Sequence, residues 1–213
     1  MDIAILIYPR FTALDAVGPY EVLSRLPDAR VTFVAEYASP QRTDTTHLAI
    51  LADAAIEDLP HPDILVVPGG PGQTALMEDG PVHAWLRAAH ETSTWTTSVC
   101  TGSLILAAAG LLDGRRATSN WQAIEELRAL GANAVEERVV FDGKLVTSAG
   151  VTAGIDMALQ LASRIGGERL AQAIQLGLEY DPQPPFDAGS PHTAPAEIVQ
   201  AVRAHSRFVE HAT

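Results

Sequence analysis

The sequence predicts an α/β fold, a flavodoxin-like three-layer α/β/α sandwich with a mostly parallel sheet. Short runs rich in Val, Ile and Leu alternate with helical patterns along the chain, as in proteins whose helices cover both faces of a sheet. The runs are almost continuously apolar, which is typical of parallel strands that are buried on both sides. Hydrophobic residues make up 47% of the 213 residues, enough for a large core. With no repeat or dividing linker, we expect one domain over residues 1–213.

The expected strands follow one another in a regular order, and the last two form a hairpin. Asp142-Gly143 lies between two apolar runs, a pattern that favours a two-residue hairpin turn. The strands are predicted over residues 3–7, 31–34, 64–67, 95–99, 139–141 and 145–147.

Helical patterns lie between these strands and after them. The stretch 181–195 is rich in proline and is predicted to be a loop. The helices are predicted over residues 18–26, 82–92, 102–111, 121–130, 155–164 and 196–211.

Composition excludes several classes of function. The formal net charge is -12 and no Lys/Arg run occurs, so we expect no nucleic-acid partner. No apolar run approaches the roughly 20 residues that span a membrane, and residues 1–7 resemble a buried strand more than a signal peptide. Cys100 is the only cysteine, which excludes an intrachain disulfide and a cysteine-cluster metal site. We expect a cytoplasmic protein without a membrane partner.

The lone cysteine lies where a nucleophile is often found. Ser98-Val99-Cys100-Thr101-Gly102-Ser103 ends a predicted strand and opens a predicted helix, and its small residues allow a sharp turn, a cysteine nucleophile elbow. A helix N-terminus favours the thiolate, so we expect an exposed thiol with a lowered pKa. The alternative is an inert core cysteine.

A glycine-rich loop follows the neighbouring strand, in Val67-Pro68-Gly69-Gly70-Pro71-Gly72. The amides of Gly70 and Thr101 are candidates for stabilising negative charge on a substrate that Cys100 attacks. The alternative is a tight turn that needs glycine for its backbone conformation.

An acid partner for the thiol is available in Asp15, which stands in an otherwise apolar stretch. From its position alone, Asp15 is as readily a helix N-cap as a catalytic group. None of the seven histidines belongs to a strand-end loop beside Cys100, so a Cys–His protease pair is disfavoured. Asn120 follows a short run and offers an amide that orients groups without taking a proton. The acidic residues and histidines show no spacing typical of a metal site.

Several motifs, in order, resemble the ThiJ/PfpI superfamily, a flavodoxin-like family related to class I glutamine amidotransferases. They cover most of the chain. They are Ile5-Leu6-Ile7-Tyr8-Pro9, Leu14-Asp15-Ala16-Val17-Gly18-Pro19-Tyr20-Glu21-Val22, Leu65-Val66-Val67-Pro68-Gly69-Gly70, Ser98-Val99-Cys100-Thr101-Gly102, Leu111-Leu112-Asp113-Gly114-Arg115-Arg116-Ala117-Thr118 and Thr147-Ser148-Ala149-Gly150-Val151-Thr152-Ala153-Gly154-Ile155-Asp156.

The resemblance implies roles for individual residues. Cys100 matches the family nucleophile and Asp15 the acidic residue that contacts it. Thr101 matches the residue beside the nucleophile that helps form the catalytic site, and Gly70 an oxyanion-side amide. Many members have Glu at the acidic position, whereas isonitrile hydratases have Asp, so Asp15 favours that branch.

The isonitrile hydratase branch implies a lyase that adds water to an isonitrile and releases an N-substituted formamide. Cys100 would form a thioimidate, Asp15 would act as general acid and base, and Val151 would line the substrate pocket. Asn120 stands where several relatives have His, at the edge of that pocket. The resemblance implies a homodimer with a small-molecule substrate, and the scheme needs no cofactor and no metal.

Three other readings remain open. One is a glyoxalase or deglycase that acts on α-oxoaldehydes through Cys100, against which Asp15 and Asn120 count. Another is a redox sensor without catalytic activity, because low-pKa exposed thiols oxidise readily. The third is a ligand-binding domain like that of the AraC-type regulators in the superfamily.

Overall fold

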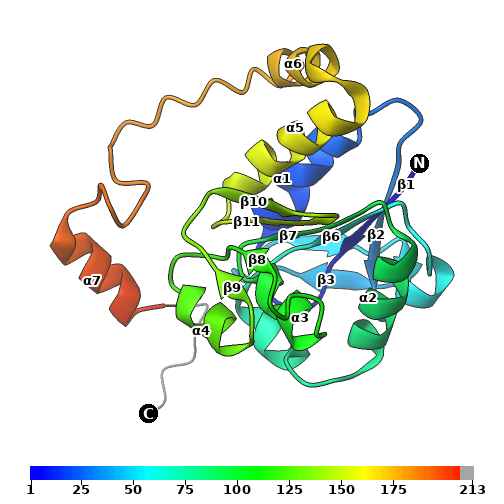
Figure 1. The fold of residues 1–213 in the computed structure, drawn as a ribbon, viewed down its shortest axis with the longest axis horizontal. Helices are drawn as coiled ribbons and strands as arrows, with labels where there is room; N and C mark the ends of the chain where they lie inside the picture. Colours follow the sequence, from blue (N-terminus) through cyan, green and yellow to red (C-terminus); the bar gives the residue numbers. More distant parts are fainter. Residues whose placement is uncertain (207–213) are drawn as a thin grey trace.

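A seven-stranded sheet forms the centre of the structure, a computed structural model that describes residues 1–206 (Figure 1). The strand order is β10-β11-β7-β6-β1-β2-β5, and all neighbours are parallel except the antiparallel pair β10 and β11. This confirms the mostly parallel α/β fold. The sheet strands are β1 (Asp2–Leu6), β2 (Arg30–Ala35), β5 (Ala54–Ala55), β6 (Ile64–Val67), β7 (Trp95–Val99), β10 (Val139–Asp142) and β11 (Leu145–Ser148).

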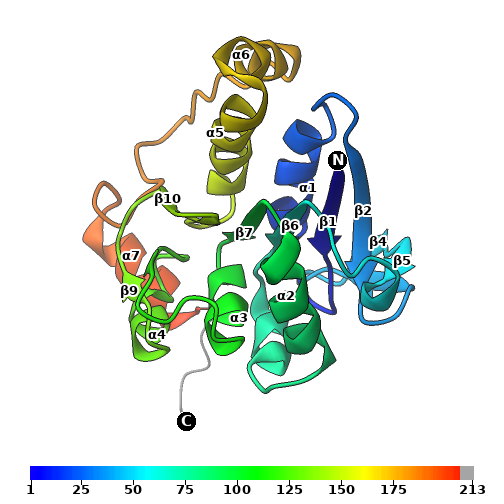
Figure 2. The ribbon, with the colours of Figure 1, turned by 45° about the vertical axis from the view of Figure 1, so that its right-hand side comes forward.

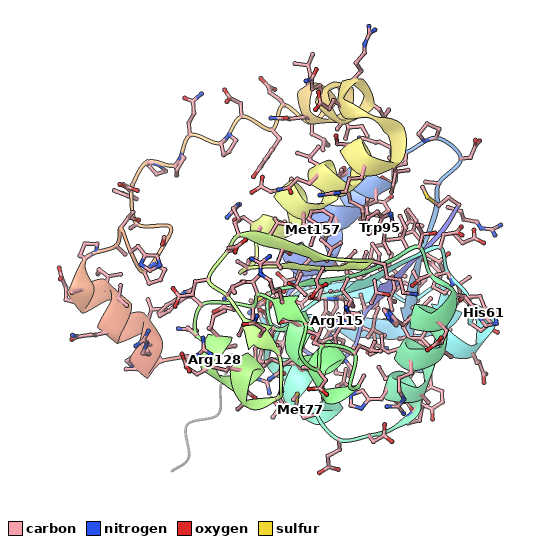
Figure 3. All side chains as sticks on the ribbon, in the orientation of Figure 1. His61, Met77, Trp95, Arg115, Arg128 and Met157 are labelled. Carbon is pink, nitrogen blue, oxygen red and sulfur yellow. The ribbon has the colours of Figure 1, made fainter. Side chains whose placement is uncertain are left out.

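Helices cover both faces of this sheet. In Figures 1 and 2, α1, α5 and α6 lie on one side of the sheet, and α2, α3 and α4 lie on the other. Figure 3 shows side chains filling the space between the layers, with Trp95 and Met157 labelled on the side of α5. The helices are α1 (Ala13–Leu23), α2 (Pro81–Thr92), α3 (Gly102–Ala108), α4 (Ile124–Ala129), α5 (Ala153–Gly166), α6 (Glu168–Gly177) and α7 (Ala196–Ala204), with 3-10 turns η1 (Ile56–Asp58) and η2 (Pro71–Leu76).

Most predicted elements are present, with shifted ends. The first helix begins at Ala13 instead of residue 18, and the last helix ends at Ala204, whereas residues 207–211 of that prediction lie outside the described part. Several elements were not predicted from the sequence: α6, the short edge strand β5 of the central sheet, and four short strands outside that sheet. These strands are β3 (Pro40–Arg42), β4 (Ala49–Leu51), β8 (Arg116–Ala117) and β9 (Asn133–Ala134).

The topology brings three loops to one point. The chain first adds β2 on one side of β1 and then returns to add β6 on the other side, so the strand order reverses between β1 and β6. In open parallel sheets, sites form at the carboxyl ends of the strands beside such a reversal. The segments that follow β1, β6 and β7 carry Asp15, in the first turn of α1, Gly70 and Cys100 respectively.

The last described segment, residues 179–206, is here called the C-terminal arm. It crosses open space from α6 to α7, and Figure 1 shows α7 beside α4. Residues 181–189 are all exposed, and α7 has no buried residue. Within residues 1–206, no helix combines the length and apolarity that a membrane crossing requires.

Candidate active site around Cys100

Cys100 occupies a strained turn between β7 and α3. Its φ is +57°, a left-handed conformation that a side chain disfavours and that persists only where the surroundings hold it. The Cys100 N–H donates to the carbonyls of Ser148 and Ala149, both at 3.1 Å. Its carbonyl accepts the hydroxyls of Ser103 (3.2 Å) and Ser119 (3.1 Å). The turn is therefore fixed from both sides, as a nucleophile elbow requires.

Gly102 allows this turn to pack against the neighbouring strand. A Cβ at Gly102 would lie 2.0 Å from the carbonyl oxygen of Val67, far inside van der Waals contact. Only glycine lets the start of α3 approach β6 this closely. The single glycine of the turn thus sets how near Cys100 lies to the glycine-rich loop.

The Cys100 side chain is fully buried, which corrects the prediction of an exposed thiol with a lowered pKa. Burial raises the pKa of the thiol well above its usual range, and the negative charge of Asp15 raises it further. The helix N-terminus alone does not overcome these two effects. A buried thiol beside a charged carboxylate therefore keeps its proton as long as the carboxylate stays charged.

Three hydrogen-bond donors act in the opposite direction. The backbone N–H groups of Thr101 and Val151 and the side chain of Asn120 hydrogen-bond the Cys100 sulfur and lower its pKa. The Asn120 Oδ1 accepts the backbone N–H of Gln122 at 3.0 Å, which turns the amide nitrogen toward the sulfur. These donors are arranged to stabilise a thiolate once it forms.

The Val151 turn faces Cys100 from β11. Val151 has a φ of +25°, an unusual backbone for a β-branched residue. A Cβ on its neighbour Gly150 would lie 2.7 Å from Nδ2 of Asn120. Space for the Asn120 amide therefore depends on glycine at position 150.

Asp15 is fully buried and lies inside the first turn of α1, which decides against the N-cap reading. The cap position belongs to Thr12, and the Asp15 Oδ2 accepts the N–H of Gly69 at 3.0 Å. Its charge acts on Cys100 and on Tyr8. The structure thus brings Asp15 and Cys100 together, 85 positions apart in the sequence.

Gly70 contributes in a different way from the one expected. Its N–H donates to Oγ1 of Thr101 at 3.0 Å, so this amide is engaged by the protein and positions Thr101. Gly70 has a φ of +134°, and a Cβ there would lie 2.5 Å from the backbone nitrogen of Thr12. The loop is therefore both a tight turn that needs glycine and a part of the site that contacts the residue next to Cys100.

Two residues of the site were not among the predicted ones. Tyr8 is buried, donates to the carbonyl of Pro68 at 2.9 Å, and has a pKa raised well above its usual range by burial and by the charges of Asp15 and Cys100. Ser119 holds the Cys100 carbonyl. Tyr8 lies two residues after the end of β1, so its place near a strand end was the signal that could have identified it.

A cavity of about 380 Å³ opens beside this centre. Asn120 and Val151, which hydrogen-bond the Cys100 sulfur, form its inner end. Pro191 and His192 of the C-terminal arm form part of its outer wall. His192 lines this cavity although no strand ends near it in the sequence.

Residues 1–206 contain no group of three or more His, Cys, Asp or Glu side chains that could hold a metal ion. Among the histidines, His83 is buried on α2, where its Nε2 lies 2.7 Å from the Leu76 carbonyl. His90 is half-buried and lies 2.9 Å from Oγ1 of Thr96. Both have structural contacts away from Cys100.

Comparison with known proteins gives consistent results. Residues 1–164 match the DJ-1/PfpI family. The chain is 47% identical over 203 residues to an isonitrile hydratase of Pseudomonas putida, covering 95% of this chain and 89% of that one. A ThiJ/PfpI family protein of Pseudomonas syringae superposes with a TM-score of 0.92 at 40% identity, covering 96% of this chain and 85% of that one.

A transcription regulator is also similar over part of the chain. The HTH-type transcriptional regulator CdhR of Pseudomonas aeruginosa is 36% identical over 129 residues, which are 60% of this chain but only 38% of the regulator. The similarity to the hydratase and to the Pseudomonas syringae protein extends over nearly the whole length of each chain. The protein belongs to the DJ-1/PfpI family.

Proposed function

We propose that this protein is an isonitrile hydratase that adds water to an isonitrile and releases an N-substituted formamide. The observation that carries the proposal is the 47% identity to the Pseudomonas putida isonitrile hydratase over 95% of the chain. A buried cysteine beside a buried aspartate, on strand-end loops of a rigid sheet, supports it.

The Cys100–Asp15 pair supplies one proton and one nucleophile. Because burial disfavours two negative charges close together, the pair carries one charge and one shared proton. In the reactive form the proton is on the Asp15 carboxyl and the sulfur is a thiolate. The N–H groups of Thr101 and Val151 and the Asn120 amide stabilise that thiolate.

In the first step the thiolate attacks the terminal carbon of the isonitrile, and the Asp15 proton passes to the same carbon. A C–S bond forms and the N≡C bond becomes N=C, which leaves a thioimidate on Cys100 and a carboxylate on Asp15. No redox change occurs, so the step needs no cofactor. The rate gain over an uncatalysed addition comes from placing the nucleophile and the acid next to the same carbon atom.

In the second step Asp15 takes a proton from water while the water oxygen adds to the thioimidate carbon, and the proton then passes to nitrogen. The tetrahedral adduct collapses as Asp15 removes the hydroxyl proton and the C–S bond breaks. The formamide leaves with its carbonyl oxygen derived from water. Cys100 returns as thiolate and Asp15 as carboxyl, which closes the cycle.

The test is formamide production from cyclohexyl isonitrile, measured by chromatography for the wild-type protein and for Cys100→Ala. We expect product from the wild type and a loss of roughly 10⁴-fold or more in Cys100→Ala, the order seen when a catalytic nucleophile is removed. Equal product from both proteins would overturn the assignment of Cys100. Product from neither would overturn the hydratase proposal and favour aldehyde chemistry or redox sensing.

We also propose, from membership of the family alone, that the protein is a homodimer. Size-exclusion chromatography with light scattering checks this directly. A mass near twice the 22.6 kDa of one chain is expected, and a mass of one chain at micromolar concentration would contradict it.

A further inference from the structure

Tyr8 is a buried tyrosine beside the Cys100–Asp15 pair, and none of the proposed chemical steps uses it. Its side chain is 4% exposed, and its hydroxyl donates to the Pro68 carbonyl at 2.9 Å. Burial, and then the charges of Asp15 and Cys100, raise the pKa of the phenol well above its usual range. The hydroxyl therefore keeps its proton and stays a hydrogen-bond donor at neutral pH.

The acceptor of this hydrogen bond belongs to the peptide group that contacts Asp15. The carbonyl of Pro68 and the N–H of Gly69 are the two ends of one planar peptide group. The carbonyl accepts the Tyr8 hydroxyl, and the N–H donates to Oδ2 of Asp15 at 3.0 Å. The phenol hydroxyl is thus connected to the carboxylate through a single rigid peptide.

Close packing and a backbone hydrogen bond hold this peptide in place. A Cβ on Gly69 would lie 2.5 Å from the backbone nitrogen of Thr101, so the loop rests directly on the Cys100 turn. The Gly69 carbonyl accepts the N–H of Thr12 at 2.8 Å, which fixes the loop to the start of α1. Removal of the phenol hydroxyl is therefore expected to leave the peptide where it is and to change only the polarisation of its N–H.

Hydrogen bonds that follow one another in a chain polarise one another. A donor on the carbonyl draws electron density from the amide and makes its N–H a stronger donor, by roughly 10–30% per bond. A stronger donor to a carboxylate favours the charged form of that carboxyl. Since Asp15 and Cys100 share one proton, a better stabilised carboxylate leaves the proton on the sulfur. The strength of the Gly69 N–H thus affects how readily Asp15 takes the proton.

We infer that Tyr8 is a positioning residue that acts on Asp15 through the Pro68–Gly69 peptide and keeps Asp15 charged in the resting enzyme. The inference rests on the proposed hydratase function and deepens it, because the reactive form requires the shared proton to move from Cys100 to Asp15. Tyr8 stabilises the resting distribution of that proton, and so sets the pH at which the pair becomes singly charged.

Few other ionisable groups surround Asp15 in the described residues. Its charge acts on Cys100 and on Tyr8. Asp44 lies at the cap of the same helix, where its Oδ2 accepts the Thr12 hydroxyl at 2.9 Å. A change of the phenol alone alters neither the thiol nor the second carboxylate, so a shift in the titration of Asp15 reports the phenol hydroxyl.

The test is the titration of Asp15 in Tyr8→Phe, followed by carbon-13 NMR of the carboxyl carbon that is absent in Asp15→Asn. We expect the proton affinity of Asp15 to rise about two- to threefold, because the hydroxyl no longer polarises the peptide. The matched control is Tyr20→Phe, which removes a hydroxyl from a half-buried tyrosine of α1 whose ring packs on Phe33. The control is expected to keep the wild-type titration. An unchanged titration in Tyr8→Phe, or an equal shift in both variants, would overturn the inference.

A second variant covers the case in which Tyr8→Phe does not fold. A 3-fluorotyrosine incorporated at position 8 keeps the shape of the side chain, and its more acidic phenol is a stronger donor. The proton affinity of Asp15 is then expected to fall, the opposite direction from Tyr8→Phe. A proton affinity that is unchanged or raised by the fluorinated residue would contradict the role of the hydroxyl.

Isonitrile turnover connects the titration to the reaction. The acid limb of the pH profile of kcat/KM for cyclohexyl isonitrile is expected to move to higher pH in Tyr8→Phe, together with the pKa of Asp15. An acid limb that stays in place while the NMR titration shifts would overturn the role of Tyr8 in the reaction. If the wild type turns over no isonitrile, the hydratase proposal fails, and the NMR titration still decides whether Tyr8 acts on Asp15.

Discussion

The Cys100 turn and the C-terminal arm differ in almost every physical respect, although residues that contact the turn and residues of the arm line the same cavity. The turn is fully buried, has a left-handed backbone at Cys100, and is held there by four hydrogen bonds, three of them to neighbouring segments. The arm is exposed along residues 181–189, and its helix α7 has no buried residue. Substitutions in the turn therefore meet a packed surrounding, whereas those in the arm meet solvent.

This difference bears on which region can carry the proposed chemistry. Attack by sulfur needs atoms placed within a fraction of an ångström, which only an over-determined turn provides. If the comparison is correct, changes in the turn alter chemistry or folding strongly, and changes in the arm alter them weakly.

The largest effect is expected for Asp15→Asn. An asparagine fills the same space and accepts the Gly69 N–H, but it neither gives nor takes a proton at neutral pH. We expect kcat for isonitrile hydration to fall by roughly 10²–10⁴-fold, the usual contribution of general acid–base catalysis. The control is Glu21→Gln, an exposed carboxylate on the same helix that pairs with Arg25; an equal loss in both would contradict the role of Asp15.

The same variant changes the Cys100 thiol in a known direction. The charge of Asp15 raises the pKa of the thiol, so the neutral amide in Asp15→Asn lowers it. Thiolate absorbance near 240 nm, taken as a difference against Cys100→Ala, gives the titration of the only cysteine. A thiol pKa that is unchanged or raised in Asp15→Asn would show that the two groups are not coupled.

A pair of glycines tests packing directly. Gly102→Ala places a Cβ 2.0 Å from the Val67 carbonyl, so the backbone must move. We expect a loss of roughly 1–3 kcal/mol in the free energy of unfolding, the range for overpacked positions. Gly189→Ala in the arm meets no atom within 4 Å and is expected to stay within about 0.5 kcal/mol of wild type. Denaturant titration measures both, and equal losses would remove the contrast.

A smaller effect concerns stability at alkaline pH. The Cys100 pKa is raised above its ordinary value of 9.0 in the folded protein, so above about pH 9 the unfolded chain loses a proton that the folded chain keeps. The stability that the protonated thiol contributes to the folded state is fully present below pH 9. It is lost as the pH rises toward the pKa of Cys100 in the folded protein, with a slope of up to about 1.4 kcal/mol per pH unit. Between pH 8 and pH 11, the free energy of unfolding is expected to fall less steeply in Cys100→Ala than in the wild type. Parallel curves for the two proteins would contradict the raised pKa of Cys100.

The sequence was sufficient for six of the seven strands of the sheet and for the segments that meet at its edge, but not for the short edge strand β5. The run at β6 is continuously apolar, and strand-end position together with the family resemblance pointed to Cys100, Asp15 and the glycine-rich loop. The start of α1 was less predictable. Pro19 resembles a first-turn residue, yet it lies well inside the helix, because packing of α1 against α5 outweighs the local preference.

The pKa of Cys100 could not be predicted from the sequence. A thiol at a helix N-terminus suggests a lowered pKa, but the degree of burial of Cys100 and its closeness to Asp15 depend on segments 85 residues apart. The Asn120 amide gains its role from a contact with Gln122 and from the space beside Gly150. His192 reaches the cavity through a long exposed arm whose path carries no periodic pattern.

The smallest effect is expected at α7, where Ile198 is 50% exposed. Ile198→Ala removes little buried apolar surface, so its free energy of unfolding is expected to change by less than about 0.5 kcal/mol. The same substitution at Ile105, which is fully buried in α3 behind Cys100, is expected to cost roughly 2–5 kcal/mol because it leaves a cavity. Denaturant titration measures the free energy of unfolding of both variants. Because both are Ile→Ala, the difference between them reports the surroundings and not the type of substitution. A loss above about 2 kcal/mol in Ile198→Ala would mean that α7 is buried in solution against another surface, and the arm would then belong to the packed part of the molecule.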